Sequence, residues 1–203
     1  MEIKNFEELE KEIGNKRVLV LGGFSGLGYE KPTKLKIEIK KRLIQEIEQV
    51  GKGNVVLVSG ATSDGIGVCY EVAKKLGLKT YGIVSEEAKQ YGVDKDCDAT
   101  FFAPDPKKTW QVLSESGDSY MVDVAKNNGV LIYYGGGEVA VKEIEEAMRK
   151  NIQVEVDSGF MPNPEKVKEK QEKNPRFYPT PVMKFVIQQK LWEPEYIKKF
   201  KIS

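Results

Sequence analysis

The strongest constraint on the fold is a pattern that occurs three times: an apolar run, a glycine-rich turn and then a helix-like stretch. The apolar runs are 17–21, 55–58 and 130–134, and each leads directly into glycines. A strand, a short turn and a helix in alternation are typical of a parallel sheet. The sequence therefore predicts an α/β fold: a doubly wound, mainly parallel sheet in a Rossmann-like three-layer α/β/α arrangement.

The remaining segments continue this alternation. Apolar periodicity predicts further strands at 80–84, 99–102 and 152–156. Helical spacing of apolar residues predicts helices at 6–13, 33–50, 67–76, 119–126 and 138–150, with a helical turn at 86–90.

The three turns carry the candidate ligand-binding residues. In an open parallel sheet, ligands bind at the carboxyl ends of the strands, where all three turns lie. Glycine lets the backbone approach a ligand closely, and the free N–H groups of the following helix attract an anion. We expect one phosphate-holding crevice, lined by Gly22, Gly23, Ser25, Gly26, Ser59, Gly60, Thr62, Ser63, Gly65, Gly135, Gly136, Gly137 and Glu138.

Some of these side chains also fit a structural role. The hydroxyls and the carboxylate at 59–64 are typical helix N-caps. Glu138 would interact favourably with the helix dipole, and we expect that role rather than contact with a ribose or base. Trp110 and Tyr120 fit equally well in the core or in a lid that stacks a base.

Composition excludes several classes of site. The chain has no histidine, which rules out Ser-His-Asp and Cys-His catalysis and histidine-ligated zinc. Cys69 and Cys97 lack C-x-x-C spacing, so we expect free thiols and no metal site, with Cys69 buried. A net charge of +1 gives no reason to expect a nucleic-acid partner. The apolar runs are too short to cross a bilayer and the start is polar, so we expect a cytoplasmic protein.

The composition changes near residue 161. From Pro162 onward, ten Lys and Arg stand against five Asp and Glu, and six of the nine prolines lie between 162 and 194. We expect a nucleotide-binding domain at 1–160 and a basic extension at 161–203. The extension would be a mobile segment, followed by an amphipathic helix at 182–191 that docks on the body or on a second subunit. A solvated surface arm is the plainer alternative.

The stretch 135–144, GGGEVAVKEI, resembles the V-G-G-G-x-G-T-x-x-E-I motif of the SLOG superfamily of Rossmann-like nucleotide-binding proteins. This superfamily includes the Lonely Guy phosphoribohydrolases and the lysine-decarboxylase-like, molybdenum-cofactor-carrier-like and DprA-like proteins. Loop 59–67 is similar to the S-G-x-A-x-G-I-D turn of the DprA branch with one residue inserted. The resemblance covers about residues 15–157. It implies a nucleotide ligand, no required cofactor, a homodimer, and Glu143 at the family's glutamate.

Two departures from the motif bear on function. Val139 and Ala140 replace the second glycine and the threonine, and no arginine lies near Ser119 or Tyr120, where the phosphoribohydrolases carry one. The resulting hypothesis is a protein that binds a nucleotide or phosphorylated nucleotide derivative, as a sensor or carrier. The alternative is an enzyme that cleaves an N-glycosidic bond of a nucleoside monophosphate with Glu143.

A third and least favoured hypothesis is a nicotinamide-dependent oxidoreductase. Loop 59–67 resembles the T-G-x-x-x-G-I-G turn of short-chain dehydrogenases, and Tyr91 and Lys95 form a Y-x-x-x-K pair. However, the turn follows the second predicted strand, whereas short-chain dehydrogenases carry it after the first. The Y-x-x-x-K pair also lies only about two dozen residues after the turn, too near in sequence for that active site.

Overall fold

The computed structural model describes residues 1–191, 193 and 201. Part of the expected extension, residues 192, 194–200 and 202–203, lies outside the described residues.

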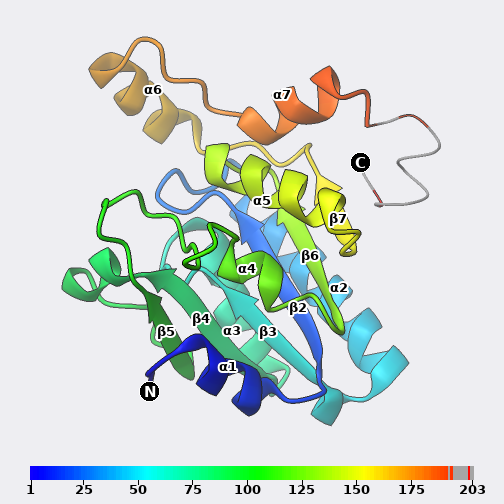
Figure 1. The fold of residues 1–203 in the computed structure, drawn as a ribbon. Helices are drawn as coiled ribbons and strands as arrows, with labels where there is room; N and C mark the ends of the chain where they lie inside the picture. The colour runs from blue at the N-terminus through cyan, green and yellow to red at the C-terminus, as the bar shows by residue number, and fades with distance from the viewer. Residues whose placement is uncertain (192, 194–200, 202–203) are drawn as a thin grey trace.

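The described chain forms one seven-stranded sheet in which every pair of neighbours is parallel (Figure 1). The strand order is β1-β5-β4-β3-β2-β6-β7. The strands are β1 (Glu2–Ile3), β2 (Arg17–Gly23), β3 (Val55–Ser59), β4 (Lys79–Ser85), β5 (Ala99–Ala103), β6 (Gly129–Tyr134) and β7 (Val154–Asp157). The expected α/β fold with a parallel sheet is confirmed.

The order of the strands has a reversal beside β2. From β2 the chain builds outward through β3 and β4 to β5, and then returns to place β6 on the other side of β2. This reversal makes the space between β2 and β6 the switch point at which open parallel sheets bind ligands. The edge strand β1, in which Glu2 pairs with Thr100, was not predicted because two residues are too short to show a period.

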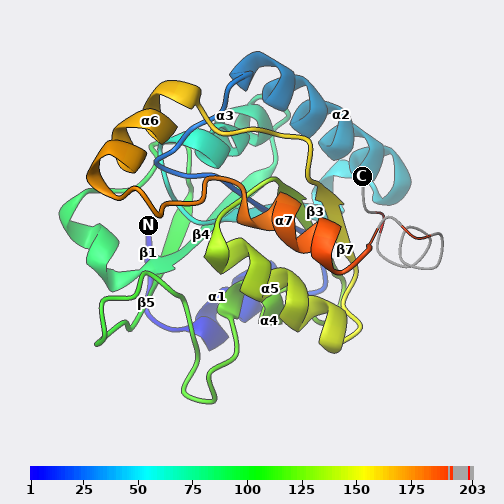
Figure 2. The same ribbon diagram turned by 90° about the horizontal axis from the view of Figure 1, so that it is seen from above.

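Helices cover both faces of the sheet (Figure 2). They are α1 (Phe6–Ile13), α2 (Pro32–Val50), α3 (Val68–Lys75), α4 (Tyr120–Asp123), α5 (Glu138–Arg149), α6 (Pro164–Lys173) and α7 (Pro181–Gln188), with short 3-10 helices at η1 (Lys52–Asn54), η2 (Gly65–Gly67) and η3 (Glu86–Gln90). Side chains of β2 alternate between two cores: Val18 and Val20 pack with α1, α4 and α5, and Leu19 and Leu21 pack with α2 and α3.

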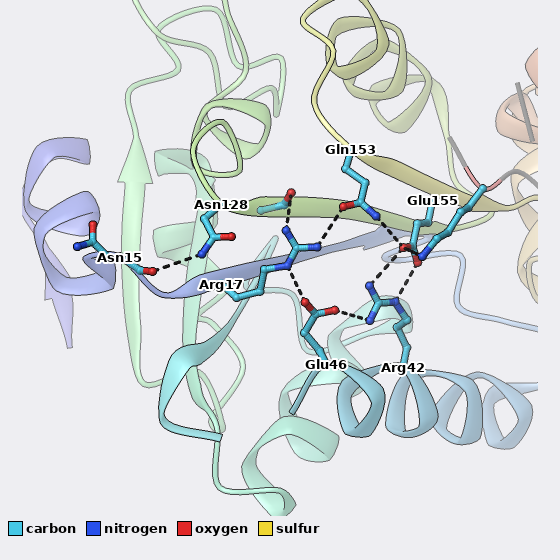
Figure 3. A network of polar contacts seen from close by, with 9 residues as sticks. Asn15, Arg17, Arg42, Glu46, Asn128, Gln153 and Glu155 are labelled. Atoms are coloured by element: carbon cyan, nitrogen blue, oxygen red, sulfur yellow. Dashed lines mark hydrogen bonds and ion pairs between the residues drawn. The ribbon is translucent and has the colours of Figure 1, made fainter. Parts of the chain in front are cut away.

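An ion-pair network fastens α2 to the sheet (Figure 3). Glu46 accepts from Arg17 Nε and from Arg42 Nη1, each at 2.6 Å, and is almost fully buried. Arg42 also pairs with Glu155 at 2.9 Å, and Lys201 reaches the same carboxylate at 2.9 Å. The network joins the start of β2 to α2 and β7. The start of β2 is the end of the strand that lies opposite its glycine turn.

The C-terminal residues contain a helix that the sequence analysis did not predict. In α6, Asn163 Oδ1 accepts the N–H groups of Glu165 and Lys166 at 2.9 and 3.1 Å, and Pro164 occupies the first turn. Helix α7 follows, and buries Val182 and other apolar residues in the core beside α5. The amphipathic helix of the extension therefore docks on the body of the same chain.

Candidate functional site

The three glycine turns meet at one cavity of about 840 Å³. They follow β3, β2 and β6, which are neighbours in the sheet, so their carboxyl ends open onto the same space. A volume in this range is typical of a small-molecule site. The predicted residues that line the cavity are Gly22, Gly23, Ser25, Gly26, Ser59, Gly60, Thr62, Ser63, Gly137, Glu138 and Glu143.

Three predicted site glycines lie outside the lining and shape the turns instead. Gly65 has a φ of +56°, and a side chain there would collide with the carbonyl of Phe24. Gly135 has a φ of +62°, and a Cβ would lie 2.5 Å from the carbonyl oxygen of Phe160. Gly136 has a φ of +137°, which side-chain-bearing residues rarely adopt. These glycines let the turns pack closely on neighbouring backbone.

Backbone donors in the lining are free. Among the described residues, the N–H groups of Ser25, Gly26, Thr62 and Ser63 have no hydrogen-bond partner. Helix α5 begins at Glu138, and its N-cap, Gly137, supplies no side-chain cap. The first N–H groups of a helix have no partner within the helix. Each of the three turns therefore contributes donors that suit an anion.

The hydroxyls of these turns differ in their availability. Ser59 Oγ is buried and donates to the carbonyl of Leu21 at 2.8 Å. Thr62 Oγ1 accepts the N–H of Asp64 at 3.2 Å. Side-chain caps are absent from the described starts of η2 and α3, so the expected N-cap role is not filled. The hydroxyls of Ser25 and Ser63 make no hydrogen bond with any described residue and remain available to a ligand.

Glu143 lies in the wall of the cavity, almost fully buried. Its carboxylate accepts hydrogen bonds from the Tyr133 hydroxyl at 2.8 Å and from Ser119 Oγ at 3.2 Å. Burial raises the pKa of Glu143 to about 7, with a smaller contribution from Glu146, against the two hydrogen bonds. Ser119 lies near the position at which the phosphoribohydrolases carry an arginine. In this chain it is a hydrogen-bond donor to Glu143 instead. Glu138 is exposed at the rim.

The positive charges of the cavity come from the C-terminal segment. Lys170 and Arg176 are the cations among its described lining residues, and neither pairs with a described carboxylate. Asn174 orients the turn, because its Oδ1 accepts the N–H of Arg176 at 3.2 Å. The segment from α6 to α7 runs across the carboxyl ends of the strands (Figures 1 and 2). The sequence analysis missed these residues, although the excess of basic residues there was a signal.

Trp110 and Tyr120 separate in the structure. Tyr120 is partly buried and packs against the core, with its ring centroid 4.6 Å from that of Phe6 and 5.1 Å from that of Phe101. Trp110 instead lines the cavity, beside Tyr91. The choice between core and cavity thus falls differently for the two aromatic residues.

The described part of the chain holds no group of three or more Cys, Asp or Glu side chains arranged to bind a metal ion. Within the same residues, none of the helices combines the length and the apolar character that a bilayer span requires. The two cysteines are free, and Cys69 is buried as expected.

No protein-family model and no curated protein sequence matches this chain. Among solved structures, it is similar to the molybdenum cofactor carrier protein MCP from Chlamydomonas reinhardtii, with a TM-score of 0.51 and 14% sequence identity over 87% of this chain and 98% of that one. It is also similar to TM1055, a structural-genomics target, with a TM-score of 0.48 and 18% identity over 77% and 81% of the two chains. At this identity the comparison concerns the fold alone. The protein has a Rossmann-like parallel α/β fold, as the resemblance of its glycine turns implied, and it shares this fold with the carrier protein.

Proposed function

We propose that this protein binds a nucleotide or phosphorylated nucleotide derivative in the cavity, as a sensor or carrier. One observation carries the proposal: three glycine turns, far apart in sequence, line a single cavity at the switch point of a parallel sheet. The carrier role is supported by the fold that this protein shares with a molybdenum cofactor carrier protein.

The phosphate would lie among the turns after β2, β3 and β6. Free N–H groups at Ser25, Gly26, Thr62 and Ser63, together with the uncapped start of α5, can donate to phosphate oxygens. The available hydroxyls of Ser25 and Ser63 add two further donors. Such donors bind an anion without requiring the arginine that the phosphoribohydrolases carry.

Lys170 and Arg176 would supply the charge that balances the phosphate. Both line the cavity and neither has a described carboxylate partner, so a bound anion would pair with them without breaking an existing ion pair. Arginine also presents paired donors that match the oxygens of a phosphate. The C-terminal segment would thus take the place of the missing arginine.

Isothermal titration with the four common nucleoside 5′-monophosphates and their parent nucleosides tests this proposal. We expect at least one monophosphate to bind, and its nucleoside to bind at least about tenfold more weakly. Arg176→Gln should weaken the monophosphate about fivefold or more. Lys173→Gln makes the same charge change on α6 outside the cavity and should leave affinity unchanged. Equal affinity for nucleosides and nucleotides would contradict the phosphate site.

A second function is favoured by Glu143, the cavity carboxyl whose pKa is raised to about 7. A carboxyl group with a pKa near neutrality can act as a general acid or base, as cleavage of an N-glycosidic bond requires. The enzyme hypothesis predicts release of free base from a nucleoside monophosphate by the wild type but not by Glu143→Gln. Bound nucleotide recovered intact after prolonged incubation would favour the sensor or carrier.

A further inference from the structure

Two aromatic side chains form an exposed surface at one side of the cavity. Trp110 is 49% exposed and Tyr91 is 74% exposed, and both line the cavity. Their ring centroids lie 5.9 Å apart, with the planes inclined by 37°. This separation is too small for a third ring to enter between them, so a planar ligand group would lie on one outer face. Aromatic rings that face a cavity are typical contacts for flat ligand groups.

A buried carboxylate holds Trp110 in place. Asp105 lies just after β5. Its Oδ2 accepts the backbone N–H of Trp110 at 2.7 Å and the Oγ hydroxyl of Ser85 at 2.9 Å. Its other oxygen accepts the N–H and the hydroxyl of Thr109, at 3.0 and 3.1 Å. Because Ser85 is the last residue of β4, the loop that carries Trp110 is tied to a rigid strand.

The backbone of this loop is strained. Lys108 has a φ of +53° and Trp110 a φ of +62°, in the left-handed region that residues with a bulky side chain rarely adopt. Strain of this kind persists where the surroundings enforce it, and it occurs preferentially at binding sites. The hydrogen bonds that Asp105 accepts from Thr109 and Trp110 hold this conformation here. In this strained conformation the loop places the indole of Trp110 at the cavity instead of in the core.

The sheet order determines where Trp110 lies relative to the glycine turns. The loop follows β5, and β4 and β3 lie between β5 and β2. With a strand spacing of about 4.8 Å, the end of β5 is roughly 14 Å from the end of β2. The lining between them includes Ile83, Val84 and Ala88, which offer an apolar floor. A ligand whose phosphate occupies the glycine turns would extend along this floor toward Trp110.

We infer that Trp110 is the stacking surface for the planar base of the ligand, and that Asp105 is the positioning residue that presents it. The inference rests on the proposed function and adds an orientation to it. The phosphate lies at the ends of β2, β3 and β6, and the base lies toward the ends of β4 and β5. Stacking does not distinguish strongly among bases, because every base has a π-face.

Fluorescence can test the contact directly. The chain has two tryptophans, Trp110 and Trp192, so Trp192→Phe leaves Trp110 as the single reporter. Trp192 lies outside the described residues. We expect AMP to quench its emission saturably. Ribose 5-phosphate, which has the phosphate but no base, should compete with AMP without quenching. Saturable AMP binding that leaves the Trp110 emission unchanged would overturn the inference.

Substitution separates a binding role from a structural one. Trp110→Ala and Trp110→Gly should each weaken AMP binding about fivefold or more, with little effect on ribose 5-phosphate. Trp110→Gly should melt at or above the temperature of Trp110→Ala, because glycine adopts a φ of +62° without strain. A tryptophan needed only for stability would instead give lower melting temperatures and unchanged affinity.

The role of Asp105 needs its own readout. In the Trp192→Phe background, Asp105→Ala should increase the quenching of Trp110 by acrylamide and weaken AMP as much as Trp110→Ala does. Asp105→Asn keeps an accepting oxygen and should restore part of the affinity. If AMP binds the wild type and both Trp110 variants equally, the inference fails while the proposed function stands. If neither the four monophosphates nor ribose 5-phosphate binds, both fail.

Discussion

The hydroxyl of Tyr133 donates a hydrogen bond of 2.8 Å to Oε2 of Glu143, and both residues line the cavity. Tyr133 belongs to β6 and Glu143 to α5, so the bond joins the two elements that flank the third glycine turn. Ser119 holds the other carboxylate oxygen. The glutamate that the sequence placed in the ligand site is therefore also a fastening point between strand and helix.

Glu143 should make the stability of the protein depend on pH. Its pKa is about 7 in the folded state and 4.5 as an ordinary glutamate, so the folded state keeps a proton that the unfolded chain loses. Stability should fall as pH rises from about 4.5 to 7, by on the order of 3 kcal/mol from this group, and then level off. Urea denaturation of the wild type and Glu143→Gln at pH 5 to 8 measures the difference. Glu138→Gln, on the exposed first turn of the same helix, should retain the wild-type profile.

Gly135→Ala should destabilise the fold by at least about 2 kcal/mol, because alanine is strained at a φ of +62° and its Cβ would press on the carbonyl oxygen of Phe160. Gly53→Ala is the matched control. Gly53 has no positive φ and has open space where the Cβ of an alanine would lie, so the stability of this variant should stay within about 0.5 kcal/mol of the wild type. Equal unfolding free energies for the two variants would show that the turn tolerates a side chain.

Glu46→Gln should be strongly destabilising. Burial disfavours ionisation of Glu46, but hydrogen bonds from Arg42 and Arg17 outweigh it and lower its pKa. Removing the charge leaves two partly buried arginines without this partner, at a cost of about 3 kcal/mol. Glu12→Gln breaks an exposed pair with Lys79 and should cost less than about 1 kcal/mol. Since the pKa is lowered, the contribution of Glu46 is present above about pH 4.5 and is lost as pH falls through the folded-state pKa.

Phe185→Ala should loosen the C-terminal cover of the cavity. Phe185 is buried where α7 packs beside α5, and its truncation should cost about 3 kcal/mol. Because α7 directly follows the segment that carries Arg176, nucleotide affinity should fall as well. Ile187→Ala, on the exposed side of α7, should leave both quantities unchanged. Thermal unfolding and isothermal titration at one temperature provide the two measurements.

Much of the fold could be predicted from the sequence because buried parallel strands and their helices have a strong apolar pattern. The strands at 17–21, 55–58 and 130–134 and the glycine turns behind them are examples, and the sheet brings those turns together. Helix α6 escaped because it has no buried residue and hence no apolar stripe. Its signal was local: Asn163 and Pro164, a cap and a first-turn proline.

The candidate site was less predictable where it depends on contacts between distant segments. Arg176 lines the cavity although it lies far along the chain from the glycine turns, and no spacing in the sequence indicates that. Likewise, the sequence does not distinguish Gly137, which lines the cavity, from Gly135, which packs on Phe160. Trp110 depends on the bonds that a buried Asp105 makes with the end of a neighbouring strand.

The segment between α6 and α7 follows all seven strands that the structure describes. Synthesis proceeds from the N-terminus, so the ribosome makes the residues of these strands and of the glycine turns before it makes Arg176. Each newly made molecule passes through a stage in which the sheet can assemble while the residues that cover it are still to emerge.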